Sequence, residues 1–149
     1  MKVFGALALV ALILAGCAAN HTKEVIQLVE RAPKAWNSGK PDAQLRGFLE
    51  SVQKLQSYDP AIVAIALKSA RDPGRDTDPF AFQHKLHLIV RTYYEVPVKG
   101  QGPWVVEEKE GTLWFTYPKA ILGAVLSPAE EFAQWQGKYP KRDLAPLLK

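Results

Sequence analysis

The spacing of apolar side chains along the chain is mostly that of amphipathic helices. From residue 41 to about residue 57, apolar positions recur every three or four residues and share one helical face: Leu45, Phe48, Leu49, Val52 and Leu55. Residues 22–36 have similar spacing, interrupted by Pro33. Residues 60–71 leave only a narrow polar strip at Lys68 and Arg71, which predicts the most buried helix of the chain.

Three of the expected helices have clear start signals. Asp59-Pro60 and Asp78-Pro79 each combine a capping aspartate with a proline suited to the first helical position. Ser127-Pro128-Ala129-Glu130 matches a capping box, again with proline at the first position. It predicts a helix that runs to about Lys138.

The stretch from Pro79 to Val96 has two interpretations. As a helix it has one apolar face and an opposite polar face that carries His84, His87, Arg91 and Glu95. As a strand it would place every second residue from Leu86 to Tyr94 on one face, and these residues have high β propensity. The start signal and the polar face favour the helix, in which Leu88 is a misfit.

A β-hairpin is predicted after the loop at residues 97–103. Its strands are Trp104 to Glu108 and Thr112 to Tyr117, around a turn at residues 109–111. The apolar run 120–126 fits either type of element. The sequence therefore predicts a mainly α fold of four to five helices, packed as helix hairpins loosely like an α-solenoid fragment, with a short β-hairpin near 104–117.

The first sixteen residues have a different pattern. Lys2 precedes a small-and-apolar run, 3–16, which is shorter than the about 20 residues needed to cross a bilayer. The run closes at Leu14-Ala15-Gly16-Cys17, which resembles the lipobox of bacterial lipoprotein signal peptides. The resemblance implies cleavage before Cys17 and a diacylglyceryl group on its sulfur, usually with a third acyl chain. An uncleaved anchor or an ordinary secretory leader with a chance cysteine are the alternatives.

The resemblance also implies a domain organisation and a location. We expect a signal peptide at 1–16, a lipidated cysteine with a short tether at 17–22, and a single domain at 23–149. The five residues 18–22 reach at most about 17 Å, so the domain should lie against the membrane. In a diderm bacterium, Ala18 in place of aspartate favours the periplasmic face of the outer membrane.

The cysteine count and the charge exclude several classes of protein. Cys17 is the only cysteine, so the chain cannot form an intramolecular disulfide. The net charge of +4 is too mild to indicate nucleic-acid binding, and an exported protein would rarely meet nucleic acid. We therefore expect no nucleic-acid partner.

Two clusters with metal-binding residue types have simpler explanations. His84 and His87 could face one metal ion from a helix, but two ligands are not a site and Arg91 would repel a cation. A solvated polar helix face is favoured. Three aspartates around the loop after residue 71 lack the glycine and distal glutamate of a helical calcium loop, and turns and caps explain them: Asp72, Asp76 and Asp78.

The hairpin glutamates are the remaining catalytic candidates. Glu107, Glu108 and Glu110 could pair as acid and base in glycoside cleavage, but on an exposed hairpin they should remain ordinary solvated carboxylates. The sequence has no nucleophile elbow, phosphate-binding glycine loop or dinucleotide fingerprint. We therefore expect no catalytic residue, no metal and no cofactor.

Tryptophans and a basic C-terminal segment are the candidate contact residues. Most tryptophans of a small domain lie in its core, and among Trp36, Trp104, Trp114 and Trp135 we expect Trp104 and Trp114 to be the exposed exceptions. Trp104, Trp114 and Trp135 are the candidate contacts with a ligand or partner. Basic residues near the C-terminus could bind anionic headgroups, although a solvated tail is favoured: Lys138, Lys141, Arg142 and Lys149.

The function that follows is a non-catalytic, lipid-anchored envelope protein, held at the membrane through Cys17, that presents a surface to another envelope component, either another envelope protein or peptidoglycan. The alternative is a cell-wall glycan-binding module in which Trp104 and Trp114 stack on peptidoglycan sugars. An enzyme is the least favoured reading.

Overall fold

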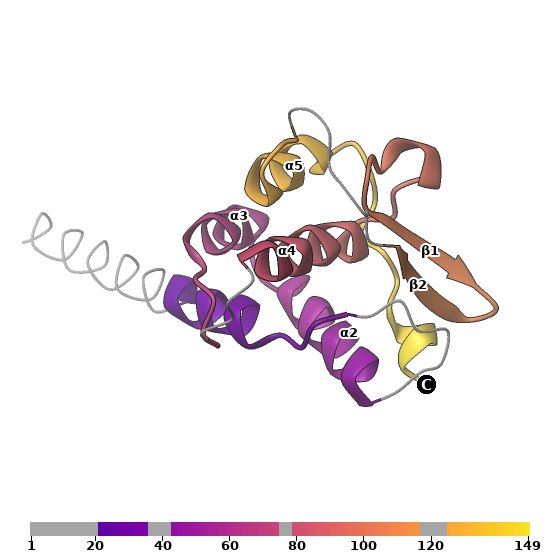
Figure 1. Ribbon diagram of the computed structural model, residues 1–149, viewed down its shortest axis with the longest axis horizontal. Helices are drawn as coiled ribbons and strands as arrows, with labels where there is room; N and C mark the ends of the chain where they lie inside the picture. The colour runs from indigo at the N-terminus through magenta and orange to yellow at the C-terminus, as the bar shows by residue number, and fades with distance from the viewer. Residues whose placement is uncertain (1–20, 36–42, 75–78, 117–124) are drawn as a thin grey trace, which may run out of the picture.

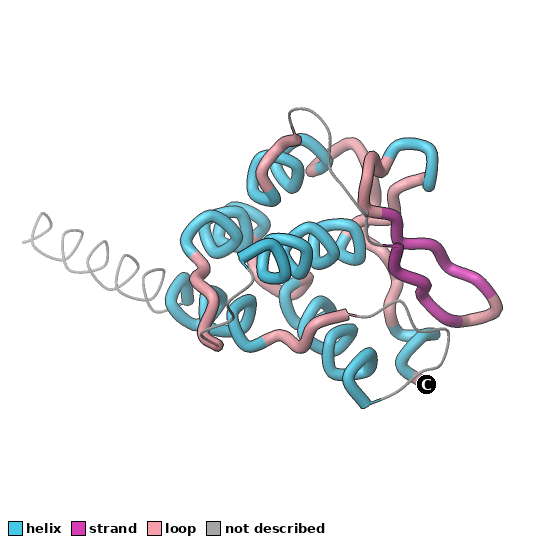
Figure 2. The backbone as a smooth tube through the Cα atoms, viewed as in Figure 1, coloured by secondary structure: helices cyan, strands magenta, loops and turns pink. Residues whose placement is uncertain are grey.

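The computed structural model describes residues 21–35, 43–74, 79–116 and 125–149. Residues 21–31 form the first helix (Figure 1). The elements that follow are α2 (Ala43–Leu55), α3 (Pro60–Ser69), α4 (Pro79–Tyr93), the 3-10 helix η1 (Val98–Gly100), β1 (Val105–Lys109), β2 (Thr112–Thr116), α5 (Pro128–Trp135) and the 3-10 helix η2 (Ala145–Leu148). The mainly α fold with one short antiparallel hairpin is confirmed (Figure 2).

Helix α4 is the centre of the packing. It contacts α2 on one side, α5 on another and β1 near its C-terminal end, while α3 packs against α5 (Figure 1). The helical interpretation of this stretch is correct, because residues Pro79–Tyr93 form one α-helix. Every residue from Lys85 to Tyr94 is buried, including Leu88. The helices therefore pack around α4, and this arrangement differs from the predicted row of helix hairpins that was loosely like an α-solenoid fragment.

The prediction that residues 60–71 form the most buried helix is wrong. In α3 only Val63, Ala66 and Leu67 are buried, and Ile65 is 49% exposed. Helix α3 is less buried than α4 because it lies at the outside of the bundle, whereas α4 has neighbours on several sides. The apolar content of a segment was therefore not enough to predict which helix is the most buried.

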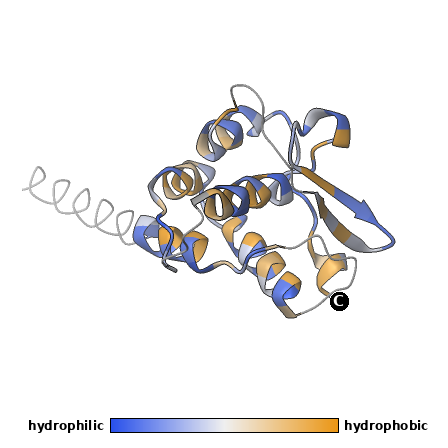
Figure 3. Ribbon diagram, viewed as in Figure 1, coloured by the Kyte–Doolittle hydropathy of each residue, from blue (hydrophilic) through white to orange (hydrophobic). Residues whose placement is uncertain are grey.

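Helix α2 buries the face that its sequence predicts. Leu45, Phe48, Leu49, Val52 and Leu55 are all buried. The charged residues between them, Arg46, Glu50 and Lys54, are exposed, and Figure 3 shows how apolar and polar residues are distributed along the helix. The ring of Phe48 meets Phe115 of β2 edge-on at 5.6 Å, which joins α2 to the hairpin.

The predicted caps are present at α3 and α5. The Asp59 side chain accepts a hydrogen bond from the Ala61 amide at 3.0 Å, with Pro60 in the first turn. Both bonds of the capping box join Ser127 and Glu130. Helix α5 ends at Trp135, earlier than predicted, and Gly137 follows with a φ of +82°. Asp78 lies outside the described residues.

The hairpin has a two-residue turn, and its first strand begins one residue later than predicted. Lys109 pairs with Thr112 across the turn, and both turn residues have positive φ, 53° at Glu110 and 75° at Gly111. Positive φ at both positions is the type I′ geometry that matches the twist of antiparallel strands. Trp36 and most of the apolar run 120–126 lie outside the described residues.

Candidate functional site

A buried ionic cluster joins α4 to α5. The Arg91 guanidinium of α4, 1% exposed, forms a bidentate ion pair with the Glu131 carboxylate of α5. It also donates to the carbonyl of Trp104 at 2.6 Å and to the carbonyl of Gln101. Arg91 therefore connects α4, α5 and the segment before β1.

Aromatic rings enclose this guanidinium. Its carbon lies 4.9 Å from the centroid of the Trp135 ring and 5.5 Å from that of Trp104, both within the range of a cation–π contact. Trp104 also stacks on His87, with centroids 3.8 Å apart and rings 10° from parallel. His84 meets the same indole edge-on at 5.8 Å.

The solvated polar face predicted for α4 is wrong at His87 and Arg91. His87 is 4% exposed, and its Nδ1 lies 3.5 Å from a Glu131 oxygen without forming a hydrogen bond to any described residue. Both side chains are covered because α5 and the segment at Trp104 pack over this face. Glu95, by contrast, is exposed.

Gln101 and Glu131 are the cluster members that sequence reasoning missed. The Gln101 amide nitrogen donates to the carbonyls of Val96 and Val106, both at 2.8 Å, and its oxygen accepts from the Val106 amide. The burial of Glu131 could have been predicted from the sequence, because Glu131 shares the i, i+3, i+4, i+7 face of α5 with Pro128, Phe132 and Trp135. Gln101 had none, since it stands in a glycine-rich loop.

The cluster is arranged to hold the fold together. The charged groups of Arg91 and Glu131 bond to each other, and the Nε and Nη2 atoms of Arg91 also donate to backbone carbonyls. Neither residue lines any of the three cavities described below. These charges therefore link α4, α5 and the segment before β1.

The structure separates the three candidate tryptophans. Trp104 and Trp135 are 2% and 6% exposed, so the expected exposure of Trp104 is wrong: its indole stacks on His87 of α4. Trp114 is 38% exposed on β2, opposite Glu107 of β1. Strand alternation places Thr112 and Thr116 on the same outer face as Trp114.

The C-terminal segment is tied to the end of α4, so a solvated tail is wrong at Arg142. Its guanidinium donates to the carbonyls of Arg91, Thr92 and Tyr94, and its amide donates to the carbonyl of Tyr93. Burial lowers the pKa of Arg142, and Glu95 and Glu108 oppose that shift.

The other basic residues of this segment are exposed. Lys141 pairs with Tyr94 in an isolated antiparallel bridge, and its ammonium donates to the Gln56 carbonyl at 3.0 Å. Lys138 and Lys149 are exposed as well.

The remaining acidic candidates are dispersed. The Asp72 carboxylate accepts from the Gly74 amide at 2.9 Å, as the turn interpretation requires, whereas Asp76 and Asp78 lie outside the described residues. Glu107 forms an ion pair with Lys109 at 3.1 Å. Within the described part of the chain, no three His, Cys, Asp or Glu side chains come together as metal ligands.

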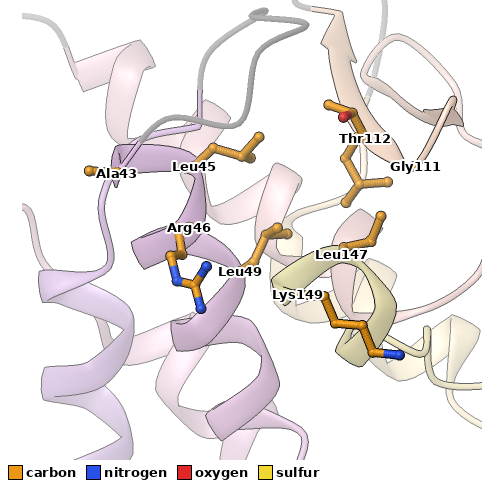
Figure 4. Close-up of a pocket in the computed structure, with 9 residues that line it drawn as sticks. Ala43, Leu45, Arg46, Leu49, Gly111, Thr112, Leu147 and Lys149 are labelled. Carbon is orange, nitrogen blue, oxygen red and sulfur yellow. The ribbon is translucent and has the colours of Figure 1, made fainter.

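The described residues line several hollows on the surface, including the following three. One of about 210 Å³ lies between α2, the hairpin turn and η2, with leucines inside and Arg46 and Lys149 at its rim (Figure 4). A second of about 240 Å³ lies between α3, α4 and the start of α5. The third, of about 540 Å³, is a wider groove beside β1, η1 and residues 139–142.

Comparison with protein-family models, with curated proteins and with solved structures found no match to this chain. Among the helices that the structure describes, none is both long and apolar enough to span a membrane.

Proposed function

We propose that this chain is a lipid-anchored protein of the bacterial cell envelope, with a non-catalytic domain that interacts with another envelope component. The observation that carries the proposal is the lipobox-like Leu14-Ala15-Gly16-Cys17 at the end of a short apolar leader. In a diderm bacterium, Ala18 favours the periplasmic face of the outer membrane.

The start of the described chain supports a position close to the lipid surface. His21 is already helical, and four peptide steps from Cys17 to His21 span at most roughly 14 Å. With two or three acyl chains on Cys17 the protein would remain membrane-bound, because a single chain already gives marginal binding and each further one adds to it. Its partner must then be within reach of the membrane.

The buried ionic cluster supports a non-catalytic role. Arg91 and Glu131 neutralise each other in the core, and Gln101 is engaged with backbone groups. These charges serve the packing of α4, α5 and β1, which suits a domain that offers a rigid surface.

Phase partition and crosslinking test the proposal in its natural host. The full-length protein should enter the detergent phase, and the Cys17→Ser variant should move to the aqueous phase because it cannot be acylated. Crosslinking in intact cells should recover a reproducible envelope partner for the wild type. A wild-type protein in the aqueous phase would contradict the anchor, and repeated recovery of no partner would contradict the interaction role.

Binding to cell-wall glycans is the second candidate, and the exposure of Trp114 favours it. An indole on an outer strand face, opposite Glu107 and between two threonines, can stack on a sugar ring while the polar groups meet its hydroxyls. Co-sedimentation with purified peptidoglycan should fall on Trp114→Ala and persist on Ile65→Ala, a matched exposed apolar residue on α3. Equal behaviour of the two variants would exclude this candidate.

A further inference from the structure

The wide groove beside β1 has an apolar floor that faces solvent. Its volume is about 540 Å³. Val98 is 46% exposed within it, so part of its apolar surface is open. The apolar lining comes from three separate parts of the chain: Val96, Pro97, Val98, Val106, Tyr139 and Pro140.

One edge of β1 borders this groove and has no partner strand in the described structure. The two-residue turn makes Lys109 and Thr112 a hydrogen-bonded pair, so Val106 and Glu108 direct their N–H and C=O groups away from β2. The Gln101 side chain occupies both groups of Val106. The backbone groups of Glu108 bond to no described residue, which leaves an open position for a further strand.

The charge of the groove selects its occupant. Glu95 and Glu108 are exposed carboxylates in its lining, and neither has a side-chain hydrogen bond or an ion pair with any described residue. Glu107 also lines the groove and is paired with Lys109. The lining cation, Arg142, is 7% exposed and directs its guanidinium to backbone carbonyls of α4. The accessible charge is therefore negative.

We propose that this groove binds an extended basic segment of another protein, which adds to the edge of β1 at Glu108. Main-chain hydrogen bonds to Glu108 would fix its register, and alternate side chains would share one face. Lysines or arginines on that face would meet Glu95 and Glu108, while apolar residues between them would cover Val98 and Tyr139. The inference rests on the proposed function, because it specifies the chemistry of the partner.

A labelled peptide of alternating lysine and valine tests the charge requirement. The mature lipidated protein in nonionic detergent should bind it, as measured by fluorescence anisotropy at low salt. The double variant Glu95→Gln/Glu108→Gln should weaken binding about tenfold, since each accessible charge pair contributes up to about 1 kcal/mol. The charge-matched control Glu50→Gln/Asp72→Asn, away from the groove, should bind as the wild type does.

The same peptide, N-methylated at every residue, tests strand addition. It keeps its side-chain charge but has no main-chain N–H to donate, so its binding should be lost. The unmethylated peptide should also slow hydrogen exchange at the Glu108 amide.

Three results would overturn the inference: equal binding of the methylated peptide, equal weakening by both double variants, or no binding at peptide concentrations up to about 1 mM. Each of these could occur while the wild type still partitions into detergent. Failure of the groove is therefore distinguishable from failure of the anchor.

Discussion

At the residue scale, the pair Arg91–Glu131 dominates the chemistry of the core. The two side chains come from positions 40 residues apart and are 1% and 8% exposed. Transferring both charges out of water is costly, and their mutual bonds with the added carbonyl acceptors offset that cost. Removing one partner therefore leaves the other buried without its opposite charge.

Glu131→Gln is expected to lower the free energy of unfolding by about 3 kcal/mol. The amide keeps the shape of the carboxylate but removes the charge that neutralises Arg91. Urea unfolding followed by circular dichroism measures the change. The matched control is Glu50→Gln, which breaks the Arg46–Glu50 pair, 57% exposed at both ends, and should cost less than about 0.5 kcal/mol. Comparable losses in the two variants would contradict a stabilising role for the buried pair.

The buried hydroxyl of Tyr93 should make the folded protein less stable at alkaline pH. Burial raises the pKa of its hydroxyl above the usual 10, and the hydroxyl bonds to no described residue. In the unfolded chain the tyrosine ionises near pH 10, whereas the folded protein keeps the proton to higher pH. The contribution of the Tyr93 hydroxyl to the free energy of unfolding is therefore complete below pH 10 and is lost as the pH rises above 10.

Tyr93→Phe should remove that dependence. At pH 7 the variant should match the wild type within about 1 kcal/mol, because the hydroxyl has no partner to lose. Between about pH 10 and pH 11.5 its free energy of unfolding should fall less steeply, as urea titrations at each pH would record. Parallel curves for the two proteins would refute the assignment.

At the scale of elements, the end of α4 depends on a distant part of the chain. The carbonyls of Arg91, Thr92 and Tyr94 accept from the Arg142 side chain, and that of Tyr93 accepts from the Arg142 amide and the Gln56 side chain. The last turn of a helix needs such acceptor partners when it is buried. The C-terminal segment therefore closes α4.

Arg142→Met should destabilise the protein by about 2 kcal/mol, because buried carbonyls lose their donors while the aliphatic packing is kept. Hydrogen exchange should also quicken at the Glu95 amide, which bonds to the Pro140 carbonyl across the same junction. Lys138→Met, at an exposed position, should leave both measurements unchanged. Unaltered exchange at Glu95 in Arg142→Met would argue against this junction.

Local signals predicted the elements well. The apolar spacing of α2, the Asp59 cap and the Ser127 capping box each act within a few residues, so the sequence alone specifies them. The hairpin was placed within one residue because its turn chemistry is also local.

The surroundings of α4 were not predictable in the same way. Periodicity separates its polar residues from its apolar ones, but it does not say whether the polar side meets water or another part of the chain. The Lys85 ammonium donates to carbonyls of Glu30 and Ala32, and Arg91 meets Glu131. Those partners lie 40 or more residues away, beyond any local pattern. The acidic residue on the apolar face of α5 was the one signal that could have revealed the cluster.

At the scale of the whole molecule, the described chain is a body built around α4, to which the proposed function adds an attachment point at the N-terminal end. The ionic cluster fixes α5 and the segment before β1 on that helix, and the acidic groove opens beside β1. In the proposed function, Cys17 sets where the body lies and the outer surfaces of the hairpin region set what it contacts.

Mass spectrometry of the mature protein, purified from membranes of its natural host, tests the central claim most directly. We predict an N-terminal peptide that begins at Cys17 and carries a diacylglyceryl group, with or without an added acyl chain. A peptide that begins at Met1, or one that begins at an unmodified Cys17, would contradict the account.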